Sequence, residues 1–287
     1  MLETSDLPPE LRLVANEHGR QFIHVDHPAV QARIALQGAH IIQCRPAGQR
    51  PLLWMSPTDP CKPDTALRGG VPLCWPWFAD EREGPAHGIA RTSNWDLVDA
   101  RVESETVHLM LELAPETITR QLPDEAWVVW VEFRLAHELE VGLTTTNTGT
   151  RPQRLSQALH SYLPVTDIAD VEITGLLGCA YIDKLQGATL VQEAPLRFAQ
   201  EVDRIYLDHH GDIDIHTGDD HLRVSRAGSE SVVLWNPWQA KAARLSQFPP
   251  DGYRTMVCVE AANAGPDGRV LAPGESHTLV TRIGRSA

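Results

Sequence analysis

Trp127-Val-Val-Trp-Val-Glu-Phe-Arg-Leu135 carries apolar side chains at every second position. The apolar residues from Val129 to Leu135 therefore share one face of an extended chain, with Glu132 and Arg134 on the other. The same alternation returns from Leu139 to Thr145, and Asn147-Thr-Gly149 ends it as a turn. Two neighbouring strands of this kind predict an antiparallel sheet with one face on a core.

Strand patterns continue along most of the chain. Further strands are expected at Leu11–Val14, Gln21–Val25, Ala32–Leu36, Ile41–Ile42, Val107–Leu113, Val171–Thr174, Leu222–Ser225, Ser231–Trp235, Thr255–Glu260 and His277–Arg282. Helical periodicity is limited to a turn or two at 185–192 and 194–198. The pattern favours an all-β sandwich or barrel over a βαβ architecture. No flexible linker interrupts residues 1–287, so a single domain is expected.

Composition and charge narrow the class of protein. The formal net charge of −13 argues against a nucleic-acid partner, because phosphate backbones attract positively charged surfaces. The N-terminal stretch Met1–Glu10 lacks the basic start and apolar run of a signal peptide, and no segment approaches the roughly 18–20 apolar residues of a membrane span. Five widely spaced cysteines without a Cys-x-x-Cys pair indicate free thiols in a reducing cytoplasm.

Two neighbouring segments are rich in residues that suit a binding loop. Arg68-Gly-Gly-Val-Pro-Leu-Cys-Trp-Pro-Trp-Phe78 and Pro85-Ala-His-Gly-Ile-Ala-Arg91 contain too many prolines and glycines for a long helix or central strand. Arginine binds anions and tryptophan packs on flat ligands, so a sugar phosphate would suit both residue types. The alternative is a loop that buries its tryptophans in the core and pairs its arginines with surface carboxylates. Both interpretations remain open on these segments alone.

A histidine and a glutamate are candidates for proton transfer. His160 lies in a strand-like run with Tyr162 on the same side, and its imidazole titrates near neutral pH. Glu260 ends the apolar run Thr255-Met-Val-Cys-Val. It is either exposed at the end of a strand or half-buried with a raised pKa, as a carboxylate tuned for proton transfer would be.

Other polar and aromatic residues have plainer interpretations. Trp235 and Trp238 flank a strand end and are core residues more often than ligand platforms. Asp203 and Arg204 are by default an exposed pair. A metal site is the alternative at Asp208-His-His-Gly-Asp-Ile-Asp-Ile-His216 with His221, but this run has no recognised metal-binding spacing, and we expect no metal there. Nucleotide-binding and serine-hydrolase motifs are also missing from the sequence.

Taken in order, several segments resemble the aldose 1-epimerase superfamily and, within it, the hexose-6-phosphate mutarotases. The two binding-loop segments carry this resemblance together with Ala158-Leu-His-Ser-Tyr162, Asp203-Arg-Ile-Tyr206, Trp235-Asn-Pro-Trp238 with Lys241, and Met256-Val-Cys-Val-Glu-Ala-Ala-Asn263. The chain departs from the family pattern at Ala79, Ser161, Leu163 and Gln247. None of these departures removes a proposed proton-transfer group.

The resemblance implies a galactose-mutarotase-like β-supersandwich of antiparallel sheets with one concave sugar-binding cleft. It implies that His160 is the acid and Glu260 the base in a ring opening and reclosure that interconverts anomers of a hexose 6-phosphate, with no cofactor. The residues implied to bind substrate are Arg68, His87, Arg91, Asp203 and Trp235. A monomer with a small sugar phosphate as its partner is expected. Two alternatives stay open: a carbohydrate-binding protein without turnover, and a mutarotase for an unphosphorylated aldose.

Overall fold

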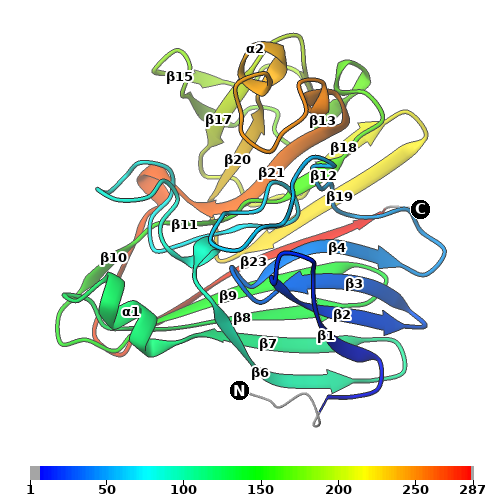
Figure 1. The fold of residues 1–287 in the computed structure, drawn as a ribbon. Helices are drawn as coiled ribbons and strands as arrows, with labels where there is room; N and C mark the ends of the chain where they lie inside the picture. The colour runs from blue at the N-terminus through cyan, green and yellow to red at the C-terminus, as the bar shows by residue number, and fades with distance from the viewer. Residues whose placement is uncertain (1–6, 286–287) are drawn as a thin grey trace.

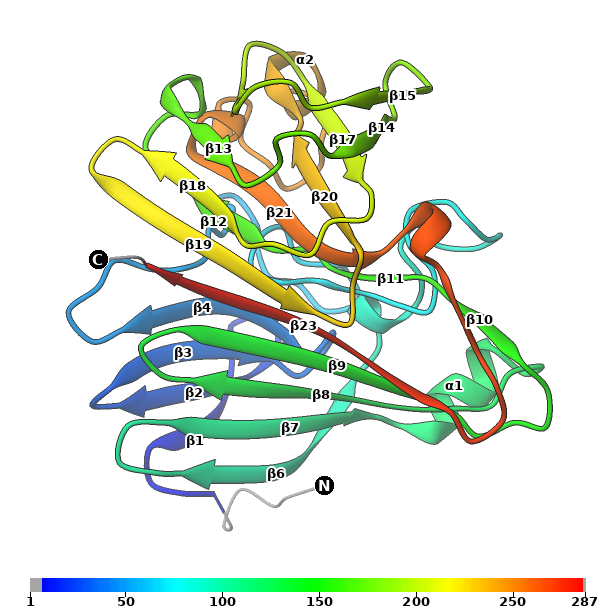
Figure 2. The ribbon, with the colours of Figure 1, turned by 180° about the vertical axis from the view of Figure 1, so that it is seen from behind.

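Antiparallel sheets dominate the computed structural model, which describes residues 7–285. Residues 1–6, part of the stretch used to argue against a signal peptide, lie outside the described residues. In the described part of the chain, no helix is long and apolar enough to cross a membrane. The predicted all-β class is confirmed, and two large sheets form its main layers (Figures 1 and 2).

The first large sheet has nine strands. In spatial order they are β16 (Leu196–Arg197), β13 (Glu172–Thr174), β18 (Ile213–Thr217), β19 (Asp220–Ala227), β23 (Ser276–Arg285), β9 (Leu139–Asn147), β8 (Trp127–Leu135), β7 (Val107–Leu113) and β6 (Trp95–Val102). The predicted alternation is observed in β8, where alternate residues are buried from Trp127 to Leu135. Its register with β9, Trp127 opposite Asn147 and Leu135 opposite Leu139, is that of a hairpin.

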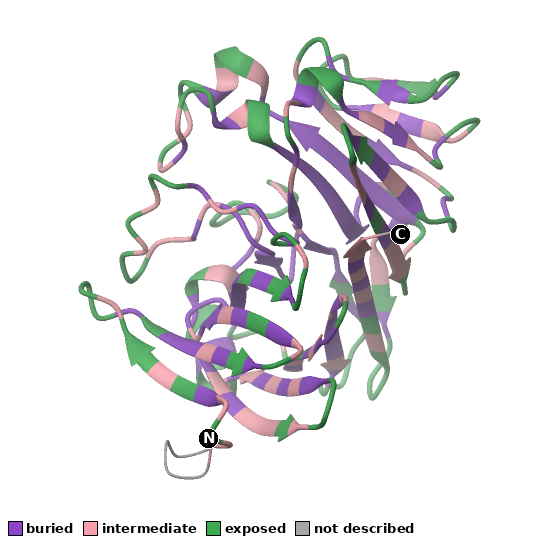
Figure 3. Cartoon of the chain, turned by 90° about the vertical axis from the view of Figure 1, so that its right-hand side faces the viewer, coloured by how far each residue is buried: buried purple, intermediate pink, exposed green. Residues whose placement is uncertain are grey.

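The second large sheet has eight strands and carries the residues of functional interest. Its order is β15 (Ala188–Val191), β14 (Ala180–Asp183), β17 (Val202–Tyr206), β20 (Ser231–Asn236), β21 (Met256–Asn263), β11 (Gln157–Leu159) and β5 (Leu73–Cys74), with β12 (Tyr162–Pro164) also paired to β21. Strands β20 and β21 are buried along their whole length, so both of their faces are covered (Figure 3).

Smaller elements complete the fold. The other strands are β1 (Leu11–Ala15), β2 (Gln21–His27), β3 (Val30–Ala35) and β4 (His40–Pro46) in one sheet, and β10 (Gln153–Leu155) with β22 (Arg269–Leu271) in another. The helices are α1 (Pro115–Gln121) and α2 (Trp238–Ala242), with 3-10 turns η2 (Ala90–Thr92), η3 (Ile168–Asp170), η4 (Gly252–Thr255) and η5 (Gly265–Asp267).

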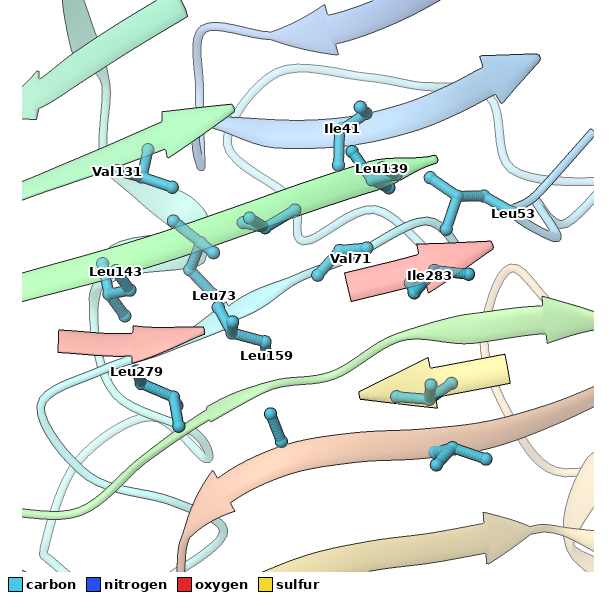
Figure 4. Packing of buried hydrophobic residues seen from close by; sticks show 14 of the residues in the cluster. Ile41, Leu53, Val71, Leu73, Val131, Leu139, Leu143, Leu159, Leu279 and Ile283 are labelled. Atoms are coloured by element: carbon cyan, nitrogen blue, oxygen red, sulfur yellow. The ribbon is translucent and has the colours of Figure 1, made fainter. Parts of the chain in front are cut away.

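The main core lies between the two large sheets. Leu73 and Leu159 from the eight-stranded sheet meet Leu143 and Leu279 from the nine-stranded sheet, and all four are fully buried (Figure 4). The same cluster extends from Leu11 to Ile283 and so draws on nearly the whole described chain. The single-domain organisation stays a prediction, which this continuous core supports.

Most predicted strands are confirmed, and the predicted helical turns are wrong. The segments at 185–192 and 194–198 contain strands β15 and β16 instead. Helix α1 lies elsewhere in the chain and begins at Pro115, where proline costs no helical hydrogen bond. The predicted free thiols are confirmed: all five cysteines are unbonded, and three of them are buried.

Candidate active site

Strand register brings three predicted side chains onto one face of the eight-stranded sheet. Asp203 on β17 pairs with Trp235 on β20, and Val233 of β20 pairs with Glu260 on β21. Side chains two residues apart on a strand point to the same side. Asp203, Trp235 and Glu260 therefore all project away from the main core, which the intervening residues of these strands contact.

This face forms the floor of a cleft of about 720 Å³. Its walls come from the predicted loop segments, from the turn after β14 and from the segment after α2. All of the predicted site residues line it: Arg68, His87, Arg91, His160, Asp203, Trp235 and Glu260. Residues separated by up to 192 positions in the chain thus meet in one place.

His160 and Glu260 contact each other directly. The Nε2 atom of His160 lies 3.3 Å from Oε1 of Glu260, and their side chains are 12% and 1% exposed. Burial raises the pKa of Glu260 well above its ordinary value, with a further contribution from Asp203, and lowers the pKa of His160 well below its ordinary value. Both shifts favour the neutral forms, so burial favours a proton shared by the pair on Glu260 over His160.

Tyr162 fixes the position of the histidine. Its ring stacks on His160 with centroids 4.9 Å apart and an interplanar angle of 14°. The backbone of this segment is tied to the first loop, because the N–H of His160 donates to Pro72 O and that of Tyr162 donates to Gly70 O. The predicted shared side of His160 and Tyr162 is confirmed.

Neither predicted arginine has a carboxylate partner in the described part of the chain. Among residues 7–285, no acidic side chain comes within 4.0 Å of the guanidinium of Arg68 or Arg91. The Arg68 guanidinium donates a long 3.5 Å hydrogen bond to the Tyr162 hydroxyl, and the Arg91 guanidinium donates to Ala86 O at 2.6 Å. The Nε of Arg68 is buried without a partner in the described residues. The positive charge of both side chains is thus available to a ligand.

Two lysines in the cleft are paired, in contrast to the arginines. Lys184 and Lys241 place Nζ atoms 3.6 and 4.0 Å from the carboxylate of Asp203, and Lys241 also lies 2.8 Å from Glu201. Burial raises the pKa of Asp203, and the two ammonium groups oppose that shift. The predicted exposed Asp203–Arg204 pair is wrong, because alternation turns Arg204 to the other face, where it lies 3.6 Å from Asp183.

Comparisons with known proteins agree with this geometry. The family model described as aldose 1-epimerase matches residues 21–284. The chain belongs to the aldose 1-epimerase family. A relative from Escherichia coli K12, provisionally named glucose-6-phosphate 1-epimerase, is 36% identical over 89% of this chain and 87% of its own length.

Solved structures extend the comparison. The crystal structure of a protein from Salmonella typhimurium, provisionally described as a mutarotase, superposes with a TM-score of 0.90 at 32% identity, covering 98% of this chain and 95% of that one. A galactose mutarotase-like protein from Lactobacillus casei gives a TM-score of 0.71 at 16% identity, covering 92% of this chain and all of its own. The predicted galactose-mutarotase-like fold is confirmed.

The loop tryptophans of the chain are core residues. Trp75 and Trp77 are buried in the main core, and their indole N–H groups donate to Thr145 Oγ1 and Pro85 O. They do not line the cleft, so of the two interpretations left open by the sequence, burial in the core holds for both tryptophans. Trp235 lines the cleft instead, with its ring edge-on to His160 at 6.0 Å.

His87 enters the cleft from a tightly constrained turn. Its backbone is left-handed, with φ of 66°, and a Cβ on the following Gly88 would lie 2.0 Å from Trp75 O. The ring packs edge-on against Phe78 and His160. Burial, reinforced by Arg91, lowers the pKa of His87 to about 3, so this imidazole is neutral at physiological pH.

The histidine-rich run at 208–221 has structural partners. His209 lies 2.8 Å from Gly175 O, and His221 lies 3.0 Å from Asp214. Among the described residues, one group of three possible metal ligands lies at the cleft floor: His160 and Glu260, which line the cleft, and Cys258, which is buried beside them, with one ligand atom of each within 4.8 Å of the others.

Sequence reasoning missed Lys184 entirely. The residue follows the short strand β14, and no motif marks it. Its approach to Asp203 depends on the pairing of β14 with β17, which only the folded structure reveals.

Proposed function

We propose that this protein interconverts the α and β anomers of a hexose 6-phosphate, with glucose 6-phosphate as the first candidate. Family membership supports an isomerase, and the name of the Escherichia coli relative supports this substrate. The observation that carries the proposal is the direct contact of His160 and Glu260 at the floor of a cleft that also holds two arginines with no carboxylate partner among residues 7–285.

The acid–base pair would open and reclose the sugar ring. Glu260 takes the proton from O1 while His160 gives a proton to O5, the C1–O5 bond breaks, and C1 becomes an aldehyde. Rotation about C1–C2 presents the other face of the aldehyde. His160 then takes the O5 proton back and Glu260 returns one to O1, so the enzyme ends in the state in which it began.

The proton balance of the pair fits this sequence of steps. The ring-opened intermediate leaves Glu260 protonated and His160 neutral, which is the distribution that burial favours. The closed sugar requires the opposite distribution. The 3.3 Å contact gives a direct route for the proton to pass from Glu260 to His160 as substrate binds.

Arg68 and Arg91 would bind the 6-phosphate. Guanidinium groups match phosphate oxygens in geometry and charge, and neither arginine must break an ion pair first. Asp203, held between two lysines, would accept hydrogen bonds from sugar hydroxyls. Trp235 and His87 would complete the walls around the sugar.

Exchange spectroscopy by NMR tests this proposal. The rate of α/β exchange is measured for glucose 6-phosphate and for unphosphorylated glucose, each with and without the protein. Strong acceleration for the phosphate alone is expected. Equal acceleration of both sugars would remove the phosphate from the proposal, and measurable binding without acceleration would favour a carbohydrate-binding protein.

A further inference from the structure

Cys258 lies beside the proposed catalytic pair but has no part in the proposed reaction. It is two residues before Glu260 on β21, so both side chains point to the cleft side of the sheet. Strand pairing places it opposite Tyr162 on one side and Trp235 on the other. One ligand atom each from His160, Cys258 and Glu260 all lie within 4.8 Å of one another.

Two polar atoms of this three-residue group make no hydrogen bond within the described residues. Glu260 Oε2 and His160 Nδ1 are buried and have no hydrogen-bond partner within residues 7–285. A buried polar atom without a partner is costly, so these atoms gain from any ligand that reaches them. For a closed-sugar substrate that ligand is a hydroxyl. A metal ion bound by His160 Nε2 and by the Glu260 carboxylate would satisfy Oε2 of Glu260, whereas Nδ1 of His160 lies on the other side of the ring.

We propose that His160, Cys258 and Glu260 form an inhibitory zinc site at the floor of the cleft. Only the inhibitory effect rests on the proposed function, because metal binding at this site does not depend on turnover. One thiolate, one imidazole and one carboxylate are a ligand set that suits Zn²⁺, whereas Mg²⁺ and Ca²⁺ prefer oxygen alone. His160 and Glu260 line the cleft and Cys258 is buried behind them, so the fourth position would face the cleft and take water.

The distances are compatible with zinc after small side-chain rotations. With metal–ligand bonds of about 2.0–2.3 Å, ligand atoms of a tetrahedral site lie roughly 3.3–3.7 Å apart. The His160–Glu260 separation of 3.3 Å already falls at this spacing. The sulfur lies within 4.8 Å of both partners, so it needs to approach by at most about an ångström.

Zinc binding would stop the reaction by occupying both proton-transfer groups. A Zn–S bond forms as the thiol proton of Cys258 leaves to solvent, and the proton held by the His160–Glu260 pair leaves as well, with no change of oxidation state. Zn²⁺ and sugar phosphate would then compete for the same cleft, and inhibition should be competitive.

Cobalt binding to the metal-free full-length protein tests the site without using activity. Co²⁺ bound to a thiolate in a tetrahedral site gives a near-ultraviolet charge-transfer band and strong visible absorption. We expect a 1:1 titration, displacement by Zn²⁺, and suppression of the band by glucose 6-phosphate. Cys258→Ala and Cys258→Ser should lose the band and bind Zn²⁺ at least tenfold more weakly, whereas Cys179→Ala, a thiol outside the cleft, should match the unmodified chain.

The outcomes separate this site from the proposed function. Unchanged zinc affinity in both Cys258 variants, or a band that survives saturating sugar phosphate, would overturn the site even if the chain is an active epimerase. A cobalt–thiolate band in a chain that accelerates no anomer exchange would sustain the metal site and overturn the proposed function. If neither Cys258 variant folds, competition between sugar phosphate and Co²⁺ in the unmodified chain still decides.

Discussion

The Nε2 atom of His160 lies 3.3 Å from Oε1 of Glu260, so the proposed acid and base touch each other on the cleft floor. A buried pair at this distance behaves as one titrating unit with a single shared proton. The catalytic state depends on how this proton is divided, and the sugar is the group that changes the division.

The first prediction concerns the pH dependence of turnover. Because burial raises the pKa of Glu260 and lowers that of His160, the pair keeps one proton over a wide range. It gains a second proton only below the lowered histidine pKa, when no base remains, and loses its proton only above the raised glutamate pKa, when no acid remains. We expect kcat/KM, which reports the groups of the free protein, to stay level over more than the roughly 2 pH units that separate ordinary glutamate and histidine. The pH profile is measured by exchange spectroscopy in a series of buffers. A narrow bell-shaped profile, with limits near the ordinary pKa values of glutamate and histidine, would contradict this account.

The second prediction concerns stability. In the unfolded chain Glu260 ionises above about pH 4.3, whereas in the folded protein its pKa is raised. The folded state therefore binds more protons between these two values, and stability falls as pH rises through that window. Glu260→Gln removes this cost and should be more stable than the unmodified chain at pH 8, with an advantage that shrinks towards pH 4 by up to about 1.4 kcal/mol per pH unit.

Urea unfolding at several pH values measures that difference. Glu132→Gln, at an exposed position on β8, is the matched control and should change stability by less than about 0.5 kcal/mol. A pH-independent effect of Glu260→Gln would show that its carboxyl is not protonated in the folded state.

The third prediction concerns phosphate recognition. Arg91→Ala should lower kcat/KM for glucose 6-phosphate by about ten- to a hundredfold, as expected for loss of charged hydrogen bonds of about 1.5–3 kcal/mol. Any residual rate with unphosphorylated glucose should not change. Arg12→Ala on the exposed face of β1 removes the same charge far from the cleft and serves as control. Equal losses for both sugars would assign Arg91 to the sugar ring or to folding.

The fourth prediction concerns the turn that presents His87. Gly88→Ala should destabilise the fold, because its Cβ would lie 2.0 Å from Trp75 O. Gly48→Ala is a close control, since φ is 71° there and 73° at Gly88, but a Cβ at Gly48 meets nothing within 4 Å. The Gly88 variant should lose at least about 2 kcal/mol more than the control in thermal unfolding. Equal losses would mean that backbone strain alone accounts for the effect.

Strands with one buried face could be predicted from sequence, and edge strands could not. In β8 one face is buried, so apolar residues occur at every second position between Trp127 and Leu135. Strand β15, from Ala188 to Val191, forms the edge of its sheet and is mostly exposed, so no alternation marks it. That is why the same segment could be mistaken for a helical turn.

The candidate site was predictable where a residue type implies its chemistry. His160 and Glu260 are an imidazole and a carboxylate in apolar runs, which made each a candidate for proton transfer. The family resemblance predicted that they act together as acid and base. Their 3.3 Å contact was not predictable, because it depends on the pairing of β12 and β20 with β21. The approach of Lys184 to Asp203 was not predictable either, because the fold sets this 3.6 Å distance and the residues next to Lys184 in the sequence form no motif.

The most direct test of the acid–base pair is the rate of glucose 6-phosphate anomer exchange in Glu260→Gln and His160→Ala, compared by NMR exchange spectroscopy with the unmodified protein. Both variants should retain the fold, and each should lose at least about a hundredfold in kcat, the usual contribution of a positioned acid or base. Near-normal rates in both variants would contradict the assignment of proton transfer to His160 and Glu260.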